Sequence, residues 1–330
     1  MASEKVKSKI ESRLVAQRNL KILPAFDIET IQKAILADFP DLTIEKVELI
    51  NNGWDNIVAL INDEYIFRFP KDDGDEYGSI GKNFDAEVKI LSFLQDKVTL
   101  QIPKVEFLGQ KFTYMGYEKI PGNDLVYTDY LTLSDDEKNQ LVFDLANFLK
   151  EIHTSVSLEQ ANEFNVDTED LNSYSEMVKN LLIDKITDPQ ILKFINQTCD
   201  EYESFAKENQ NLVFLYNDLH TENMAFDSEK KKINGIFDFS DCMIGDVHMD
   251  FHSLYKFDPQ LMKAVAEKYQ ELTSTKLNLR RMVVTARIAE LCDLAQFIDQ
   301  PESRVYKNTM NNVKKWMSEV DIFKNTNKEF

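Results

Sequence analysis

The chain has 330 residues, enough for one large domain or two ordinary ones. Its formal net charge of -19 disfavours binding to nucleic acid or anionic membrane and would attract cations. Three widely spaced cysteines without a CxxC pair, a charged N-terminus without a signal-peptide core, and no run long enough to cross a bilayer predict a cytoplasmic protein.

The first part of the chain is predicted to be a small antiparallel sheet with helices. Residues 1–24 read as a polar extension, and Asp27 is a good N-cap for a helix over 27–39. The predicted strands cover 43–50, 56–61, 64–69, 104–109 and 112–120, and an amphipathic helix covers 83–95. The sequence IPGND, residues 120–124, is a strong breaker, so we place a domain boundary after residue 120.

The rest of the chain is predicted to be mainly helical. Ser134 caps a helix whose apolar residues fall on one face. Further helices are predicted over 171–183, 188–208, 259–273, 278–298 and 302–319, and short strands over 211–215, 223–227 and 233–239. The sequence therefore predicts an α+β protein with a small sheet followed by a larger helical part that carries a β insert.

Two acidic loops follow strands of that insert. Asp218 and Asn223 lie in the first loop, and Asp238 lies at the end of the strand that follows. Asp and Asn are ordinary turn formers, so either loop alone is also consistent with a polar hairpin. Together they supply a proton acceptor and the oxygen ligands that Mg²⁺ prefers, and we expect the three side chains to meet around that ion.

The segments NDLHTENMAFD and GIFDFSDCMIGDVHMDF resemble the catalytic and metal-binding signature of protein-kinase-like enzymes. Together with EYIFRFPK, FDAEVKIL, IPKVEFLG, YMGYEKIPG and LANFLKEIH, they are similar in order and spacing to the 2''-phosphorylating branch of the aminoglycoside phosphotransferases. The resemblance covers roughly residues 25 to 256. It implies a bilobal protein-kinase-like fold, with a nucleotide-binding lobe over 25–120 and a helical lobe with the substrate site over 121–330.

The resemblance also implies roles for individual residues. Asp218 would accept or orient the proton of the attacking hydroxyl, and Asn223 and Asp238 would hold Mg²⁺ at the nucleotide phosphates. Arg68 stands where the family usually has a phosphate-contacting Lys, and Glu87 would pair with it. From the residues alone, Arg68 could instead be a surface Arg, and Glu87 a solvated charge on its helix.

Two more residues are predicted to contact the nucleotide. Gly53 lies in the loop NNGWDN, and Ile120 follows the last strand of the first lobe, where the hinge would face the base.

The sequence departs from the family pattern at several positions. Tyr216 replaces the usual His two residues before the base, and Ser240 and Val247 replace a Gly and a Pro. After Asp250, the acidic run of the 2''-type enzymes is absent and Lys256 is present.

The predicted function is transfer of the γ-phosphate of ATP or GTP to a hydroxyl of a cationic, aminoglycoside-type substrate. The alternatives are a kinase for another small alcohol, such as a macrolide, an amino alcohol or a hydroxyl amino acid, and a nucleotide-binding pseudokinase. A Walker NTPase and a serine hydrolase lack their motifs. A zinc site at His248 and His252 lacks a third ligand with suitable spacing.

Overall fold

The computed structural model describes residues 22–50, 56–71 and 79–318. They belong to two compact units. The sheet unit comprises the described parts of Met1–Asn123, Asn162–Val166 and Met224–Asp241, and the helical unit comprises those of Asp124–Ala161, Asp167–Asn223 and Cys242–Phe330. The predicted boundaries at residues 24 and 120 stay predictions.

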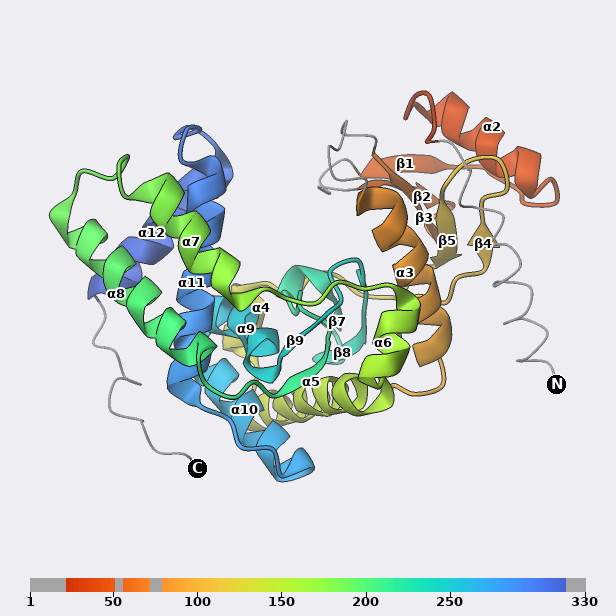
Figure 1. Cartoon of the computed structure of the whole chain (residues 1–330). Helices are drawn as coiled ribbons and strands as arrows, with labels where there is room; N and C mark the ends of the chain where they lie inside the picture. Colours follow the sequence, from red (N-terminus) through yellow and green to blue (C-terminus); the bar gives the residue numbers. More distant parts are fainter. Residues whose placement is uncertain (1–21, 51–55, 72–78, 319–330) are drawn as a thin grey trace. The chain divides into compact units, whose positions relative to one another are not determined.

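The sheet unit is built on a five-stranded antiparallel sheet in the order β1-β2-β3-β5-β4 (Figure 1). Its strands are β1 (Val47–Ile50), β2 (Asn56–Ile61), β3 (Tyr65–Pro70), β4 (Phe107–Leu108) and β5 (Met115–Glu118). The helices α2 (Ile28–Asp38) and α3 (Ser79–Leu94) contact β1 and β3, respectively. The predicted strands and both helices are therefore confirmed, although the fourth strand is only two residues long.

Apolar residues fix which face of β3 is buried under α2. Phe67 and Phe69 are fully buried with Ile31 and Ile35 of α2 in one core cluster. Arg68 lies between the two phenylalanines, so the period of two turns its side chain to the opposite face of the sheet. The sequence thus places one charged residue on the face away from the apolar cluster.

A hairpin from the middle of the chain completes the sheet unit. It consists of β7 (Met224–Asp227) and β8 (Lys232–Ile236). Gly235 forms a bridge with Gln101, and a Cβ at Gly235 would lie 2.3 Å from the Gln101 carbonyl oxygen. Only glycine allows this close approach of the two backbones.

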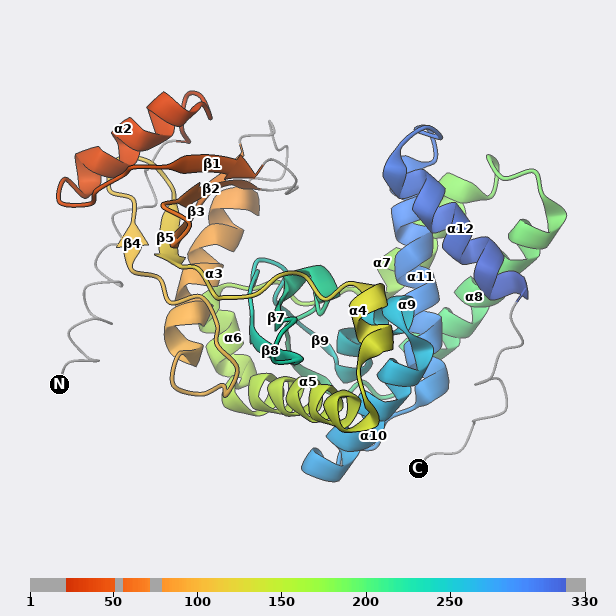
Figure 2. The ribbon, with the colours of Figure 1, turned by 180° about the vertical axis from the view of Figure 1, so that it is seen from behind.

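The helical unit contains most of the helices, which Figures 1 and 2 show from two opposite sides. They are α4 (Tyr127–Thr132), α5 (Asp135–Ser155), α7 (Leu171–Leu182), α8 (Pro189–Ala206), α9 (His252–Phe257), α10 (Pro259–Thr273), α11 (Leu279–Phe297) and α12 (Arg304–Ser318). Another helix, α6 (Leu158–Phe164), spans the change from one unit to the other. The predicted Ser134 cap is confirmed as a full capping box with Glu137.

The core of the helical unit is centred on α11. Fifteen of its residues are buried, and Leu291 and Val284 pack with α7, α8 and α12 in one cluster. A helix that is buried on nearly all sides must neutralise its polar residues by pairing them. Arg280, Arg281, Glu290 and Asp293 of α11 are accordingly ion-paired, and Arg287 lies over the Phe194 ring.

A strand that the sequence did not predict pairs with the strand before the first acidic loop. It is β9 (Met243–Asp246), which is antiparallel to β6 (Leu212–Leu215). The short segments η1 (Thr221–Asn223) and η2 (Val247–Phe251) follow β6 and β9 and were not predicted either. The predicted strand over 233–239 ends earlier, at Ile236, because Asp238 takes a left-handed backbone conformation with φ 65°.

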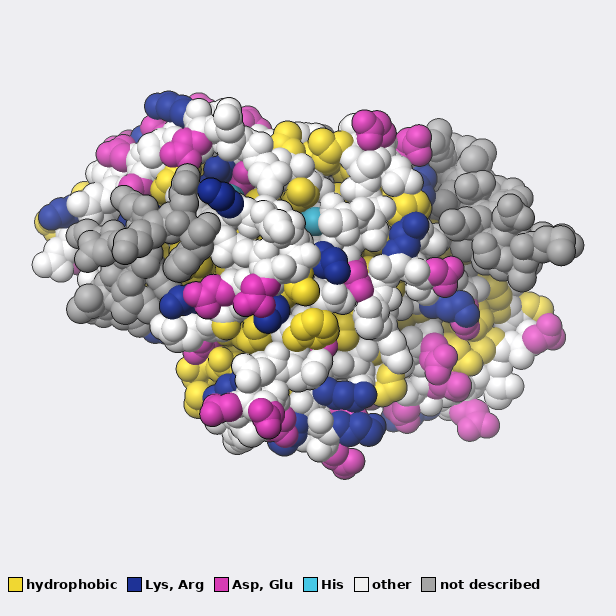
Figure 3. All heavy atoms as spheres, turned by 90° about the horizontal axis from the view of Figure 1, so that it is seen from below, with side chains coloured by type: hydrophobic (Ala, Val, Ile, Leu, Met, Phe, Trp, Pro, Cys, Tyr) yellow, Lys and Arg dark blue, Asp and Glu magenta, His cyan; other side chains and the backbone are white. Residues whose placement is uncertain are grey.

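The face shown in Figure 3 carries Lys and Arg interspersed with Asp and Glu. Although the chain has a negative net charge, its acidic side chains do not form one continuous patch on this face. Within the described residues, no helix combines the length and the apolar character that crossing a membrane requires.

Candidate active site

The first acidic loop holds Asp218 by contacts from its own residues. The Asn223 side-chain nitrogen donates to Asp218 Oδ2 at 2.7 Å and to the Asp218 carbonyl at 3.1 Å. His220 Nε2 lies 3.1 Å from Asp218 Oδ1. The turn is closed by the His220 N–H, which donates to the Asp218 carbonyl at 2.6 Å. The carboxylate is thus held in one orientation and is one-quarter exposed.

The surroundings of Asp218 keep it ionised. Burial alone would raise the pKa of Asp218, but the hydrogen bond and charge of His220 and the hydrogen bond of Asn223 outweigh burial and lower it. The pKa of His220 is raised, because Asp218 more than offsets the burial that would lower it. An ionised carboxylate that remains partly exposed can accept a hydrogen bond from a substrate hydroxyl.

Asp250 anchors the backbone just before Asp218. Its side chain is fully buried and accepts hydrogen bonds from the Tyr216 N–H at 3.1 Å and from the Asn217 N–H. His153 of α5 contacts the same carboxylate through Nε2 at 2.7 Å and Tyr269 through Nδ1 at 2.8 Å. Asp250 therefore links the loop to α5 and α10, a positioning role that the sequence did not reveal.

Tyr216 has a place in this arrangement although it departs from the family pattern. Its side chain is fully buried, with its ring 5.5 Å from that of Phe148 in an edge-to-face contact. Because Asp250 accepts the Tyr216 backbone N–H, this hydrogen bond holds the loop without a contribution from the residue 216 side chain.

In the sheet unit, Arg68, Glu87 and Asp238 form one buried ion-pair network. Arg68 donates through Nη1 to Glu87 Oε1 and through Nη2 to Asp238 Oδ1, the latter at 2.8 Å. Arg68 is 4% exposed and Glu87 2%, which excludes the alternatives that Arg68 is a surface residue and Glu87 a solvated charge. The structure thus brings together three of the predicted site residues; their roles toward a nucleotide stay predictions.

Further contacts fix the two carboxylates. The Phe239 N–H donates to Glu87 Oε1 at 3.1 Å, and Ser240 Oγ donates to Asp238 Oδ1 at 2.8 Å. Ser240, which replaces the usual glycine, therefore contributes a contact to Asp238. The Asp238 side chain remains 37% exposed.

Charge pairing keeps Arg68 protonated. Burial would lower the pKa of Arg68, but the charges of Glu87 and Asp238 outweigh it and raise the pKa well above its usual value. The planar guanidinium contacts two carboxylates from different elements, which a single ammonium group does less well. The substitution of Lys by Arg therefore fits the two-partner geometry.

Each acidic loop contains a left-handed residue at, or directly before, a predicted site residue. Asn217, directly before Asp218, has φ 67°, and Asp238 has φ 65°. Asn and Asp tolerate this conformation better than other residues with a Cβ, and such conformations gather at functional sites.

The remaining predicted residues are placed as follows. Ile120 is half-buried in the segment after β5, and Gly53 lies outside the described residues. Asp218 and Asn223 belong to the helical unit and Asp238 to the sheet unit, so their meeting around Mg²⁺ stays a prediction.

The residues present fit an oxygen-preferring cation. Since the Asn223 amide nitrogen donates to Asp218, its Oδ1 is the atom that would bind a cation. Asp238 supplies an exposed carboxylate. A carboxylate and an amide oxygen are hard donors of the type that Mg²⁺ uses beside phosphates.

The zinc alternative is not supported in the described part of the chain. His248 contacts Asp246 through Nδ1 at 2.6 Å and accepts the Asn278 N–H at Nε2 at 2.9 Å. His252 contacts the Met249 carbonyl through Nδ1 at 2.7 Å. Among these residues no cluster of three or more His, Cys, Asp or Glu is arranged to hold a metal ion.

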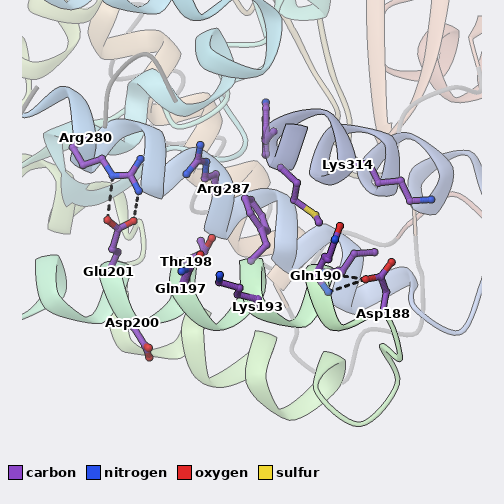
Figure 4. A pocket seen from close by; sticks show the side chains of 14 residues that line it. Asp188, Gln190, Lys193, Gln197, Thr198, Asp200, Glu201, Arg280, Arg287 and Lys314 are labelled. Atoms are coloured by element: carbon purple, nitrogen blue, oxygen red, sulfur yellow. Dashed lines mark hydrogen bonds and ion pairs between the residues drawn. The ribbon is translucent and has the colours of Figure 1, made fainter. Parts of the chain in front are cut away.

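A separate cavity of about 960 Å³ lies in the helical unit among α8, α11 and α12. Figure 4 shows Arg280 and Glu201 paired on its wall, where Arg280 Nε donates to Glu201 Oε1 at 3.2 Å. Its lining contains none of the predicted site residues, so we do not assign it to phosphate transfer.

Two features define the kinase-like class of fold. One is an antiparallel sheet with a buried cation–carboxylate pair between β3 and α3, and the other is a helical unit with an Asp–Asn loop. Solved structures of similar fold support this class. The GDP complex of an aminoglycoside 2'-phosphotransferase-IIIa F108L mutant has a TM-score of 0.77 and 20% identity, covering 88% of this chain and 97% of that one. The gentamicin complex of APH(2'')-IIa has a TM-score of 0.61 and 23% identity, covering 90% and 97%.

A macrolide 2'-phosphotransferase from Brachybacterium faecium has a TM-score of 0.61 at 12% identity, covering 86% of this chain and 97% of that one. Similarity at these identities shows the fold, and it confirms the predicted kinase-like α+β class. The family is shown by the sequence itself, since the model of the phosphotransferase enzyme family matches residues 46–282. The chain belongs to this family, and it is an enzyme of the phosphotransferase class.

Proposed function

We propose that the protein is a small-molecule kinase that transfers the γ-phosphate of ATP or GTP to a hydroxyl of an aminoglycoside-type or other hydroxylated amine. The observation that carries this proposal is the ionised Asp218, held by Asn223 and His220 in the loop after β6. Phosphoryl transfer needs little covalent help from the protein, and a fixed acceptor for the hydroxyl proton is the main requirement on the substrate side.

On the nucleotide side, we propose that Arg68, Glu87 and Asp238 act as one unit. Glu87 and Arg68 hold the Asp238 carboxylate in place, and Arg68 supplies positive charge toward the phosphates. Ile120 and Gly53 are proposed to contact the nucleotide. Related structures contain GDP, ATP or ADP, which supports a nucleotide donor without selecting its base.

Asn223 and Asp238 are the proposed holders of Mg²⁺. When bound there, the ion would neutralise the charge that develops on the transferred phosphate. The chain's own residues orient these ligands, since Asp218 binds the Asn223 nitrogen, and Arg68 and Ser240 hold Asp238.

Kanamycin, gentamicin and macrolide enzymes among the structural neighbours define the acceptors to test first. A kinase for another small alcohol is the second candidate, and one observation favours it. Lys256 places a positive charge in the helical unit, where it pairs with Glu290 and Asp293.

A pseudokinase is disfavoured because three of the departures from the family pattern have a structural partner. Arg68 binds two carboxylates, Ser240 binds Asp238, and Tyr216 fills a core position beside Phe148. Drift after loss of activity would not be expected to leave these groups paired.

The test is Asp218→Asn in a phosphate-transfer assay with ATP and GTP against a panel of hydroxylated amines. We expect transfer to fall by roughly 10²–10⁴-fold, because the acceptor for the hydroxyl proton is lost. Nucleotide affinity, measured by calorimetry, is expected to stay nearly unchanged. Glu222→Gln removes a charge from the same loop and serves as the control that should retain most activity. Unchanged turnover in Asp218→Asn would refute the assignment.

A further inference from the structure

One buried ion-pair cluster in the helical unit has no part in the reaction described so far. Lys256 of α9 reaches α11, where its Nζ lies 2.9 Å from Glu290 Oε2 and 3.2 Å from Asp293 Oδ2. The Lys256 side chain is 16% exposed and that of Glu290 4%. Glu290 also accepts a hydrogen bond from Asn312 at 2.8 Å. Two carboxylates thus converge on one ammonium group that belongs to the protein.

The cluster lies next to the segment that supports the loop of Asp218. The helix α11, which carries Glu290 and Asp293, contacts both α9 and η2. Asp250 of η2 accepts the backbone N–H groups directly before Asp218. The Lys256 cluster is therefore packed against the support of the proposed acceptor site.

The cluster can be reached from solvent on one side. Asp293 is 47% exposed, whereas Glu290 and Lys256 lie deeper. A pair of carboxylates, one buried and one accessible, is an arrangement that would bind an ammonium group of a ligand. In this chain Lys256 already occupies it.

An internal ammonium changes what a ligand meets there. A polycation gains affinity from unpaired carboxylates and loses it where like charge is fixed in the site. With Lys256 in place, an approaching amine finds Asp293 already paired and a positive charge behind it. A ligand with one amine, or none, loses no affinity at this carboxylate pair.

We propose that Lys256 determines acceptor specificity by occupying the Glu290–Asp293 carboxylate pair with its own ammonium group. The acceptor is then a hydroxylated compound with at most one positive charge, and polyamines are disfavoured. This inference rests on the proposed function, and of its two candidate acceptors it favours the other small alcohol over the polycationic aminoglycoside.

The test is calorimetric binding of kanamycin, a polyamine, and of an alcohol with a single amine to nucleotide-free protein. Lys256→Met frees the carboxylate pair, and kanamycin affinity is expected to rise about tenfold or more, or about 1.4 kcal/mol. Affinity for the single-amine alcohol is expected to change far less. Lys263→Met, which breaks an exposed pair with Glu267 on α10, makes the same change in net charge and should leave both affinities unchanged.

Two further variants guard against loss of folding. Lys256→Met leaves Glu290 buried with one partner fewer, so Lys256→Met/Glu290→Gln removes that charge and retains Asp293. The double variant is expected to bind kanamycin more tightly than the wild type, but less tightly than the single variant. Lys256→Arg keeps the positive charge and should discriminate against kanamycin as the wild type does.

The inference is wrong if Lys256→Met binds kanamycin no better than the wild type, or if Lys263→Met gives the same gain. Efficient phosphorylation of kanamycin by the wild type, with no change in KM in Lys256→Met, would also overturn it. Failure of the proposed function has a different signature, namely no phosphate transfer to any acceptor by the wild type, whatever the binding data show.

Discussion

Replacing Arg68 by Lys separates the two contacts that the guanidinium makes. Arg68 donates to Glu87 and to Asp238 through different nitrogens, and a single ammonium group cannot serve both equally well. Glu87 is almost fully buried, whereas Asp238 is 37% exposed. Loss of the Glu87 contact would leave an uncompensated buried charge, so we expect Lys to keep Glu87 and to release Asp238.

The expected loss of stability depends on the contacts that Asp238 keeps in Arg68→Lys. A hydrogen bond to a charged group contributes about 1.5–3 kcal/mol, and Asp238 retains the contact from Ser240 as well as access to water. We therefore expect Arg68→Lys to lower the stability of the sheet unit by about 1.5 kcal/mol. Arg68→Met removes both contacts and should cost about 3–5 kcal/mol, as for a broken buried pair.

The assay is native-state hydrogen exchange at amides of β3 and β5 and at the Phe239 N–H, which binds Glu87. Lys46→Met removes an exposed ion pair with Asp63 in the same unit and should leave exchange unchanged. If Arg68→Lys exchanges like the wild type, the contact with Asp238 contributes nothing. If Arg68→Lys is as unstable as Arg68→Met, Lys does not retain Glu87, and the reasoning fails.

Two further predictions concern the helical unit. Burial raises the pKa of Glu169 to about 7 from an ordinary 4.5, so the folded state binds this proton more tightly than the unfolded state, and stability falls as pH rises through this range. In urea unfolding at pH 4.5 and at pH 8, the free energy of unfolding should fall between the two pH values by about 3 kcal/mol less in Glu169→Gln than in the wild type. Parallel pH profiles of the two proteins would contradict this. Tyr216→His restores the usual family residue but removes a buried ring beside Phe148 and should cost about 1–3 kcal/mol in thermal unfolding. Its kcat should be retained because Asp250 still binds the backbone N–H of residue 216, and a large rise in kcat would show instead that Tyr216 limits activity.

Local signals in the sequence predicted most elements of the fold. The Ser134 capping box and the Asp27 cap define helix starts through contacts within three residues, which a sequence can show directly. The alternation around Arg68 likewise explains, from local sequence, why its side chain faces away from the phenylalanines. The strand β9 was missed because its four residues include Gly245 and show no alternation of their own.

The candidate site was only partly predictable, because several of its contacts join distant segments. Asp250 binds residues 34 and 33 positions earlier, and His153 97 positions earlier. Lys256 finds its partners on α11. Residue type and spacing identified Asp218, Asn223 and Asp238 as chemically suitable, but nothing local indicates which buried groups hold the loop.

The return of the chain to the sheet unit constrains how that unit can be made. Gln101 pairs with Gly235, Asn123 with Phe226, and Arg68 with Asp238, so these three contacts cannot form until residue 238 has been synthesised. A fragment cut after residue 123 would retain the buried Arg68 with one of its two carboxylates missing. During translation, the sheet unit therefore cannot complete its contacts until about half of the helical unit has been synthesised.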